Sequence, residues 1–397
     1  MPTEISFAAD PREAGLDPEK VTALLDRANE EVQAGLLPAA QIAIARHGKI
    51  GAMRSYGIAV QAGIAQPVDN ETLFPVFSCT KAVVSAAAWI LIGEGKLDPG
   101  ERVADIIEGF GANGKDAVIV EHLFLHTAGF PNASMPPLEW LDRIKRQARF
   151  ASWRLEWLPG SRFVYHPTAT FWAIAEIIER RGGEDFRSFI RNRIASPLAL
   201  DGLSVGLDKA KSRRVADLVF VGDSMTDEQL QLMGLPAGTQ PAVTEQALLG
   251  INDPAVREVG IPGGGGLMTT GDLALFYQSV LGHLDGSREL GIWRRDTLID
   301  ALRVRSGDLS DPMIGVKVNR ALGVIVAGDD GLGAYRGFGN GGSPLAFGHG
   351  GAGGQIGWAD PDSGISFAYS TNGMDRNFIR QIQRGIALST LAAACAL

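Results

Sequence analysis

The stretch that most constrains the fold of this chain is the apolar segment of residues 82–92, A-V-V-S-A-A-A-W-I-L-I. A helix formed by this segment is apolar nearly all round, so it has to be buried inside a large core. Phe74–Phe77 is a short apolar run, and the residues S-C-T-K at 78–81 join it to the long segment. The pattern predicts a small group of polar residues at the mouth of a buried helix.

Ser78 and Lys81 carry the chemistry that this position suggests. On a helix, residues three apart share one face, with Cβ atoms about 5–6 Å apart. The positive end of the helix dipole favours an alkoxide or oxyanion at Ser78, and an amine beside it can hold or accept the hydroxyl proton. The same spacing also fits a plain helix cap followed by an exposed lysine, because short motifs arise by chance. Cys79 is expected to be a small buried residue.

Charge and cysteine content argue against several classes of partner. The chain has 37 Lys and Arg against 45 Asp and Glu, a net charge of −8, which disfavours nucleic acid and anionic membranes. Cys79 and Cys395 lie far apart and make no metal-ligand spacing. The start of the chain lacks the basic and apolar parts of a secretory signal, and the longest apolar run is too short to cross a bilayer. We therefore expect a cytoplasmic protein with no cofactor and no metal.

Strand patterns occur at both ends of the chain, and helical patterns fill the middle. The ends are predicted to pair in one antiparallel sheet of about five strands flanked by terminal helices, an α/β (α+β) architecture. Residues 1–98 plus 255–397 would form this sheet domain. Residues 99–254 would form a mainly helical domain with a long irregular segment near 223–262. The active site is expected between the two domains.

Three further motifs accompany the serine and the lysine. Tyr165 lies in F-V-Y-H-P before a predicted helix at 168–181, and a phenol on a loop can relay a proton. A glycine-rich stretch, F-G-H-G-G-A-G-G at 347–354, lies on a predicted strand, where glycines mark a close approach to the backbone. The third motif is L-H-T-A-G at 125–129. Its histidine, His126, is expected to be structural.

In this order the motifs resemble those of the serine β-lactamase-like hydrolases. The branch in question includes class C β-lactamases, DD-peptidases and family VIII carboxylesterases, and the resemblance covers roughly residues 35–373. It implies a β-lactamase/transpeptidase-like fold. It also implies that Ser78 is the acylated nucleophile, that Lys81 takes or stabilises its proton and that Tyr165 is the general base. Which of Lys81 and Tyr165 is the base in such enzymes is left open.

The resemblance also implies where a substrate would be held. The oxyanion hole would consist of the backbone N–H groups of Ser78 and Ala352. His349, Gly350 and Gly351 would line the binding site, and Trp157 is a candidate wall of an acyl pocket, although aromatic residues at such spacing usually belong to the core.

Two departures from the family pattern favour esters over β-lactams. Pro167 stands where class C β-lactamases carry an asparagine that grips the substrate amide, and proline has neither a side-chain donor nor an N–H. His349 stands where a lysine usually holds the lactam carboxylate, and histidine is mostly neutral near pH 7. We expect a carboxylesterase-type hydrolase acting on a small-molecule ester. A β-lactamase, an amidase or D-peptidase, a transacylase and a non-catalytic penicillin-recognising protein are the alternatives, and homo-oligomer formation is left open.

A second serine motif competes with Ser78. The residues G-L-S-V-G at 202–206 match the nucleophile elbow of α/β-hydrolases, which needs a strand before the serine and a helix after it. Here a helix and Ser196-Pro197 precede the motif, and a polar stretch follows it. Ser204 is therefore predicted to lie in a surface strand or turn without a catalytic role.

Overall fold

The computed structural model describes residues 7–232, 234, 243–288, 291–313 and 315–397. Its main sheet has seven strands in the order β3-β2-β1-β11-β10-β9-β8, with every neighbouring pair antiparallel. The strands are β1 (Ala39–Arg46), β2 (Lys49–Gln61), β3 (Ile64–Pro67), β8 (Ile325–Val326), β9 (Phe347–Gly350), β10 (Ile356–Ala359) and β11 (Ile365–Thr371). The prediction of a sheet from both chain ends is confirmed, and two short edge strands, β3 and β8, raise the number from about five to seven.

The two chain ends meet where β1 pairs with β11, from Ala40 opposite Thr371 to Arg46 opposite Ile365. The hairpin from β1 to β2 turns at His47 and Gly48, whose φ angles of 52° and 74° match the turn that best fits twisted strands. Alternate residues of β1 face opposite ways, so Ile42 and Ile44 belong to one buried cluster and Ala43 and Ala45 to another. Both faces of the sheet are therefore covered.

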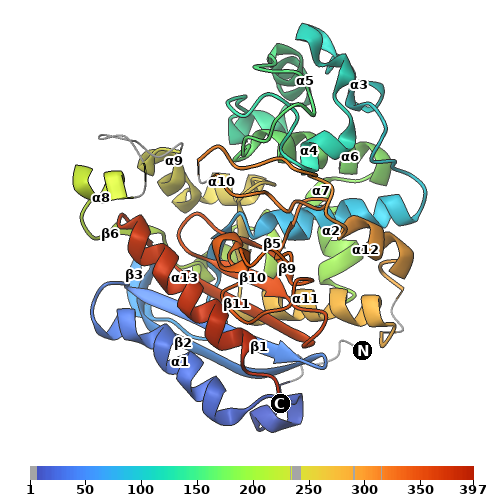
Figure 1. Ribbon diagram of the computed structural model, residues 1–397. Coiled ribbons are helices and arrows are strands. Elements are labelled where there is room, and N and C mark those ends of the chain that lie inside the picture. Colours follow the sequence, from blue (N-terminus) through green and yellow to red (C-terminus); the bar gives the residue numbers. More distant parts are fainter. Residues whose placement is uncertain (1–6, 233, 235–242, 289–290, 314) are drawn as a thin grey trace.

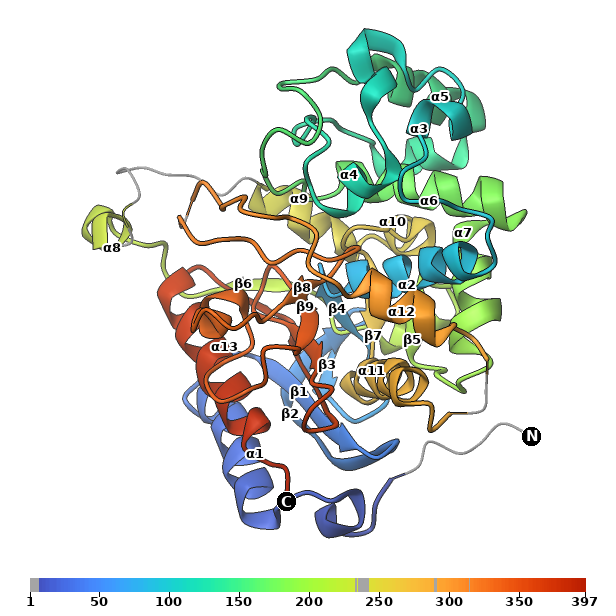
Figure 2. The ribbon, with the colours of Figure 1, turned by 45° about the vertical axis from the view of Figure 1, so that its right-hand side comes forward.

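Terminal helices cover one face, as predicted. Helix α1 (Pro18–Gln33) begins at Asp17, whose carboxylate accepts hydrogen bonds from the N–H groups of Glu19 and Lys20. It packs beside α13 (Phe378–Ala393), and the two lie together against the sheet in Figures 1 and 2. Helix α11 (Thr270–Asp285) covers the other face, against β1, β11 and β10.

Helix α2 (Thr80–Gly93) lies between the sheet and the helical region, against α6, α7 and α12. Its side chains are buried from Thr80 to Leu91, as the all-round apolar sequence predicts. The helical region, at the top of Figure 1, comprises α3 (Val103–Ile106), α4 (Val120–Phe124), α5 (Arg143–Ser152), α6 (Ala169–Gly182) and α7 (Phe186–Ile190); α12 is Arg295–Ala301.

Two small sheets connect the middle of the chain to its ends. The first has the order β4-β7-β5, with β4 (Phe74–Phe77), β7 (Gly266–Met268) and β5 (Leu203–Val205). The second pairs β6 (Val219–Val221) with β12 (Gly373–Asp375). The middle segment thus contributes two strands to sheets made with the ends, and the domain limits at 98/99 and 254/255 stay a prediction.

Some elements differ from the sequence-based expectations. The apolar run of residues 321–327 forms only the two-residue strand β8, and β7 precedes the helix at 270, where no strand was predicted. In the segment near 223–262, the described residues include the short helices α8 (Asp227–Leu232), α9 (Glu245–Leu249) and α10 (Pro254–Val259). Residues 233 and 235–242 of that segment lie outside the described part of the chain.

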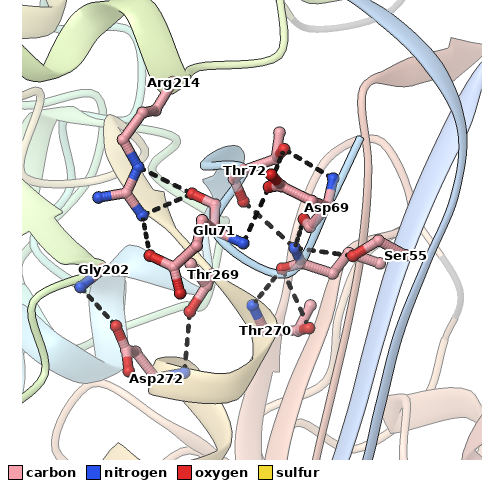
Figure 3. A network of polar contacts seen from close by, with 10 residues as sticks. Ser55, Asp69, Glu71, Thr72, Gly202, Arg214, Thr269, Thr270 and Asp272 are labelled. Atoms are coloured by element: carbon pink, nitrogen blue, oxygen red, sulfur yellow. Dashed lines mark hydrogen bonds and ion pairs between the residues drawn. The ribbon is translucent and has the colours of Figure 1, made fainter. Parts of the chain in front are cut away.

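A buried polar network ties the start of α11 to the main sheet (Figure 3). The Gln41 side chain on β1 donates to the backbone oxygens of Asp69 and Thr72, at 2.8 and 3.3 Å, and to Ser55 Oγ at 3.2 Å. Its oxygen accepts from the Thr270 N–H at 2.7 Å. One glutamine therefore connects β1, β2 and the first residue of α11.

Candidate active site

A sharp turn between β4 and α2 presents Ser78. Strand β4 ends at Phe77, whose φ of 44° lies in the left-handed region that bulky residues rarely adopt. Ser78 comes next, and its carbonyl accepts from the Lys81 N–H at 3.0 Å. The residue therefore precedes the first turn of α2 rather than lying in it, because α2 begins at Thr80. Ser78 is half-buried between buried neighbours, so the turn brings this hydroxyl toward the surface.

Lys81 is fully buried, and its ammonium group contacts three oxygens. Nζ lies 3.1 Å from Ser78 Oγ, 2.8 Å from the Pro167 carbonyl and 2.5 Å from the Gly263 carbonyl. Burial lowers the pKa of Lys81 from its usual value, Tyr165 opposes this shift, and the nearby Arg320 cation adds to it. No carboxylate contacts Nζ within the described residues, so no negative charge stabilises the ammonium form. This lysine therefore loses its proton more easily than an exposed lysine does.

Tyr165 approaches the same hydroxyl from the other side. It lies on an irregular segment before α6, and its Oη is 2.8 Å from Ser78 Oγ. Lys81 Nζ lies 5.1 Å from the centre of the Tyr165 ring. The structure thus brings together Ser78, Lys81 and Tyr165, the three residues that the sequence analysis identified as catalytic candidates.

His349, on β9, stands beside Tyr165 with the ring centres 6.1 Å apart. Its Nε2 is 3.1 Å from Nη1 of Arg320, which can only donate, so Nε2 accepts and Nδ1 carries the proton toward the Gly350 carbonyl at 2.8 Å. Burial and the cations of Arg320 and Lys81 hold the pKa of His349 well below its usual value. The imidazole is therefore neutral, as the sequence analysis expected.

Arg320 is the residue that sequence reasoning missed. It is only 7% exposed, and its guanidinium lies 5.5 Å from the ring centres of both Tyr165 and Phe163. Among the described residues its side chain has the His349 ring as its hydrogen-bond partner and no carboxylate. The available signal was its position directly before an apolar run. An arginine next to a buried strand is rarely buried without a specific partner, so its position indicates a possible role.

Comparisons with known proteins agree with this geometry. The sequence model of the Beta-lactamase family matches residues 25–392. This chain belongs to the Beta-lactamase family. It is 28% identical over 311 residues to the esterase/beta-lactamase LipL of Mycobacterium tuberculosis, covering 75% of this chain and 68% of LipL.

Solved structures of similar proteins share the fold over nearly their whole length. A penicillin-binding protein homologue from Caulobacter crescentus has a TM-score of 0.76 and 28% identity, covering 96% of this chain and 98% of that one. A family VIII carboxylesterase has a TM-score of 0.74 and 26% identity, covering 94% and 97%. The β-lactamase/transpeptidase-like fold and the family resemblance are confirmed.

In this Beta-lactamase family chain, the glycine-rich strand lies directly against the turn that carries Ser78. A Cβ on Gly351 would be 2.7 Å from the Val76 carbonyl on β4, so the close approach requires glycine. Cys79 Sγ lies 3.1 Å from the His349 carbonyl. Ala352 follows in an exposed turn, and its N–H donates no hydrogen bond to another described residue. The oxyanion hole of Ser78 and Ala352 stays a prediction, as do the binding roles of Gly350 and Gly351.

Trp157 and Ser204 lie away from these contacts. The Trp157 ring packs against His166 at 6.1 Å and beneath Arg162 at 5.3 Å, so its place in an acyl pocket also stays a prediction. Ser204 is in β5, opposite Leu267 of β7, which matches the surface strand expected from the sequence. His349 is engaged with Arg320, and the described hydrogen bonds give Ser204 no base.

The described ranges contain neither a metal site nor a membrane-spanning helix. These residues contain no group of three or more His, Cys, Asp or Glu side chains able to hold a metal ion. Their helices are all too short or too polar to cross a membrane.

Proposed function

We propose that this protein hydrolyses small carboxylic esters through an acyl-enzyme on Ser78. The observation that carries the proposal is the convergence on Ser78 Oγ of Tyr165 Oη at 2.8 Å and Lys81 Nζ at 3.1 Å. A serine becomes a nucleophile when a neighbouring base takes its proton, and here two candidate acceptors are already at hydrogen-bond distance.

The reaction uses these groups in sequence. Ser78 Oγ attacks the ester carbonyl while its proton passes to the Tyr165–Lys81 pair, and the N–H groups of Ser78 and Ala352 stabilise the carbonyl oxygen as it becomes negative. The pair returns the proton to the departing alcohol, which leaves an acyl group on Ser78. Tyr165, paired with Lys81, then takes a proton from water as the water attacks the acyl group. The same pair returns this proton to Ser78 Oγ, which releases the acid and restores the serine.

The surroundings of Lys81 support an ester as the substrate. The Pro167 carbonyl binds Lys81 Nζ, so this position holds the lysine and offers no donor to a substrate amide. Esters are also easier to cleave than amides. LipL and the family VIII carboxylesterase are both named as esterases, which agrees with this substrate class.

The test compares two serines in one assay. Ser78→Ala is expected to lower kcat/KM for p-nitrophenyl acetate by at least about 1,000-fold and to abolish covalent labelling by a fluorophosphonate. Ser204→Ala is the matched control and should leave both unchanged. Peptide mapping of the labelled protein would locate the adduct. Retained turnover in Ser78→Ala, or label on Ser204, would refute the proposal.

Hydrolysis of β-lactams is a second candidate activity, and Arg320 favours it. His349 is neutral, but the Arg320 guanidinium behind it supplies the positive charge that a lactam carboxylate needs. Nitrocefin hydrolysis that depends on both Ser78 and Arg320 would support this candidate. Amide and D-peptide substrates, and an added alcohol acceptor, separate the amidase, peptidase and transacylase alternatives. A cytoplasmic location remains part of the proposal, because Cys79 and Cys395 are both buried and unpaired.

A further inference from the structure

His126 occupies an unusual position behind the catalytic tyrosine. It follows α4 with a φ of 57°, in the left-handed region, and its side chain is 0% exposed. Its ring centre is 4.6 Å from that of Tyr165. The other rings around it are those of Phe163, His166 and Phe171, at 6.0 to 6.2 Å.

The residues on either side of Tyr165 are both hydrogen-bonded to His126. The Val164 N–H donates to the His126 carbonyl at 3.3 Å, and the His166 N–H donates to His126 Nδ1 at 3.2 Å. The peptide groups that flank the tyrosine are therefore held by one residue, through its backbone on one side and its ring on the other.

Neighbouring contacts extend this attachment along both segments. The Gly160 N–H donates to the Thr127 carbonyl at 2.9 Å, and the Phe130 N–H donates to His166 Nε2 at 3.1 Å. The segment that carries Tyr165 has no helix or strand of its own, so these bonds replace the ladder that would hold a regular element. His126 supplies the two bonds next to the tyrosine.

The ring of His126 is suited to accepting this hydrogen bond permanently. Because Nδ1 accepts from a backbone N–H, the ring proton is on Nε2. Burial, and then the nearby cations of Arg320 and Lys81, hold the pKa of His126 well below its usual value. The ring therefore stays neutral, keeps Nδ1 as an acceptor and takes no part in proton transfer.

We propose that His126 is a positioning residue that sets the place of the Tyr165 phenol through the two peptide groups on either side of it. The inference rests on the proposed function, in which that phenol moves a proton at Ser78. Tyr165 Oη must stay within hydrogen-bond distance of Ser78 Oγ, and a displacement of about 1 Å at a reacting group can lower a rate about 100-fold.

Two substitutions separate the acceptor from the bulk of the ring. His126→Ala removes Nδ1, whereas His126→Asn keeps a side-chain oxygen near the same place and tolerates a left-handed backbone. His126→Ala is expected to lower kcat for p-nitrophenyl acetate about 30-fold with KM changed less than about threefold, and His126→Asn should recover kcat to within about fivefold of the native enzyme. Far-ultraviolet circular dichroism and Tm confirm folding. If the alanine variant does not fold, His126→Gln replaces it, because its oxygen lies too far along the side chain to substitute for Nδ1.

A double-mutant cycle tests whether the effect passes through the phenol. Once Tyr165→Phe has removed the hydroxyl, adding His126→Ala should change kcat by less than about threefold. Multiplied losses in the double variant, an unchanged kcat in the folded acceptor-deficient variant, or no recovery with asparagine would each overturn the inference alone. Full activity in Tyr165→Phe would instead overturn the proposed role of Tyr165, and the inference with it.

Discussion

Lys81 and Asp272 are two buried charged groups in matching positions. Each lies in the first turn of a helix, α2 or α11, that follows one of the adjacent strands β4 and β7. Lys81 is 0% exposed and Asp272 is 1% exposed. Burial lowers the pKa of Lys81 and raises the pKa of Asp272 to about 7.

The two groups differ in what they contact. Lys81 Nζ reaches the half-buried hydroxyl of Ser78 at 3.1 Å, next to Tyr165. Asp272 Oδ2 accepts from the Gly202 N–H at 2.5 Å, and its other oxygen has no hydrogen-bond partner among the described residues (Figure 3). A perturbed pKa is therefore common to both positions, and a reactive partner within reach distinguishes the catalytic candidate from the structural one.

The largest expected effect contrasts these two groups directly. Lys81→Met removes the amine beside Ser78 and is expected to lower kcat/KM for p-nitrophenyl acetate about 1,000-fold. Asp272→Asn changes the matching group, which has no nucleophile beside it, and should alter kcat/KM less than about threefold. Steady-state kinetics on both variants, with Tm as the check on folding, measure the difference. Similar losses in the two variants would remove the contrast.

A second prediction concerns Arg320, the cation whose charge lowers the pKa of Lys81. Arg320→Gln is expected to lower kcat/KM for the anionic ester mono-p-nitrophenyl succinate about tenfold relative to that for neutral p-nitrophenyl acetate. Arg320→Lys keeps the charge and should lose less of this selectivity. Equal loss toward both esters would show that Arg320 does not act on the substrate charge.

The pH dependence of the rate gives a third prediction. If the neutral amine of Lys81 is needed, kcat/KM rises with pH through a pKa below the usual lysine value, because burial lowers it. Arg320 also lowers this pKa, whereas Tyr165 raises it. Arg320→Gln should therefore move the acid limb of the pH profile to higher pH. A shift to lower pH, or none, would contradict the assignment of that limb to Lys81.

The last prediction concerns stability rather than rate. The folded state binds the Asp272 proton more tightly than the unfolded state, since the folded pKa is about 7 and the ordinary value is 3.8. Stability from this group is thus greatest at low pH and is lost as pH rises from about 4 to about 7, an effect of roughly 2 kcal/mol between pH 5 and pH 8. Asp272→Asn should reduce the fall in unfolding free energy over that interval. Denaturant unfolding at the two pH values measures it, and an equal fall in both proteins would contradict the prediction.

Local patterns predicted the elements whose signals are contained in short segments. The all-round apolar sequence of α2 predicts a buried helix, and the structure agrees. The cap at Asp17 and the turn at His47-Gly48 are local features of the same kind, because each depends on neighbouring residues. Arg320 and strand β7 were not predicted, because their roles come from partners far away in the chain: Arg320 meets Tyr165 and His349, and β7 pairs with β4 and β5.

By itself, the sequence of this chain determined the buried helix, the antiparallel sheet from its two ends, and the candidates Ser78, Lys81 and Tyr165. The tertiary structure decided the distances among them, the burial that lowers the pKa of Lys81, the charge that Arg320 supplies behind a neutral His349, and the two bonds from His126 to the neighbours of Tyr165. The reason is physical: helix and strand preferences depend on adjacent residues, whereas desolvation, charge and hydrogen-bond geometry depend on which distant residues the fold brings into contact.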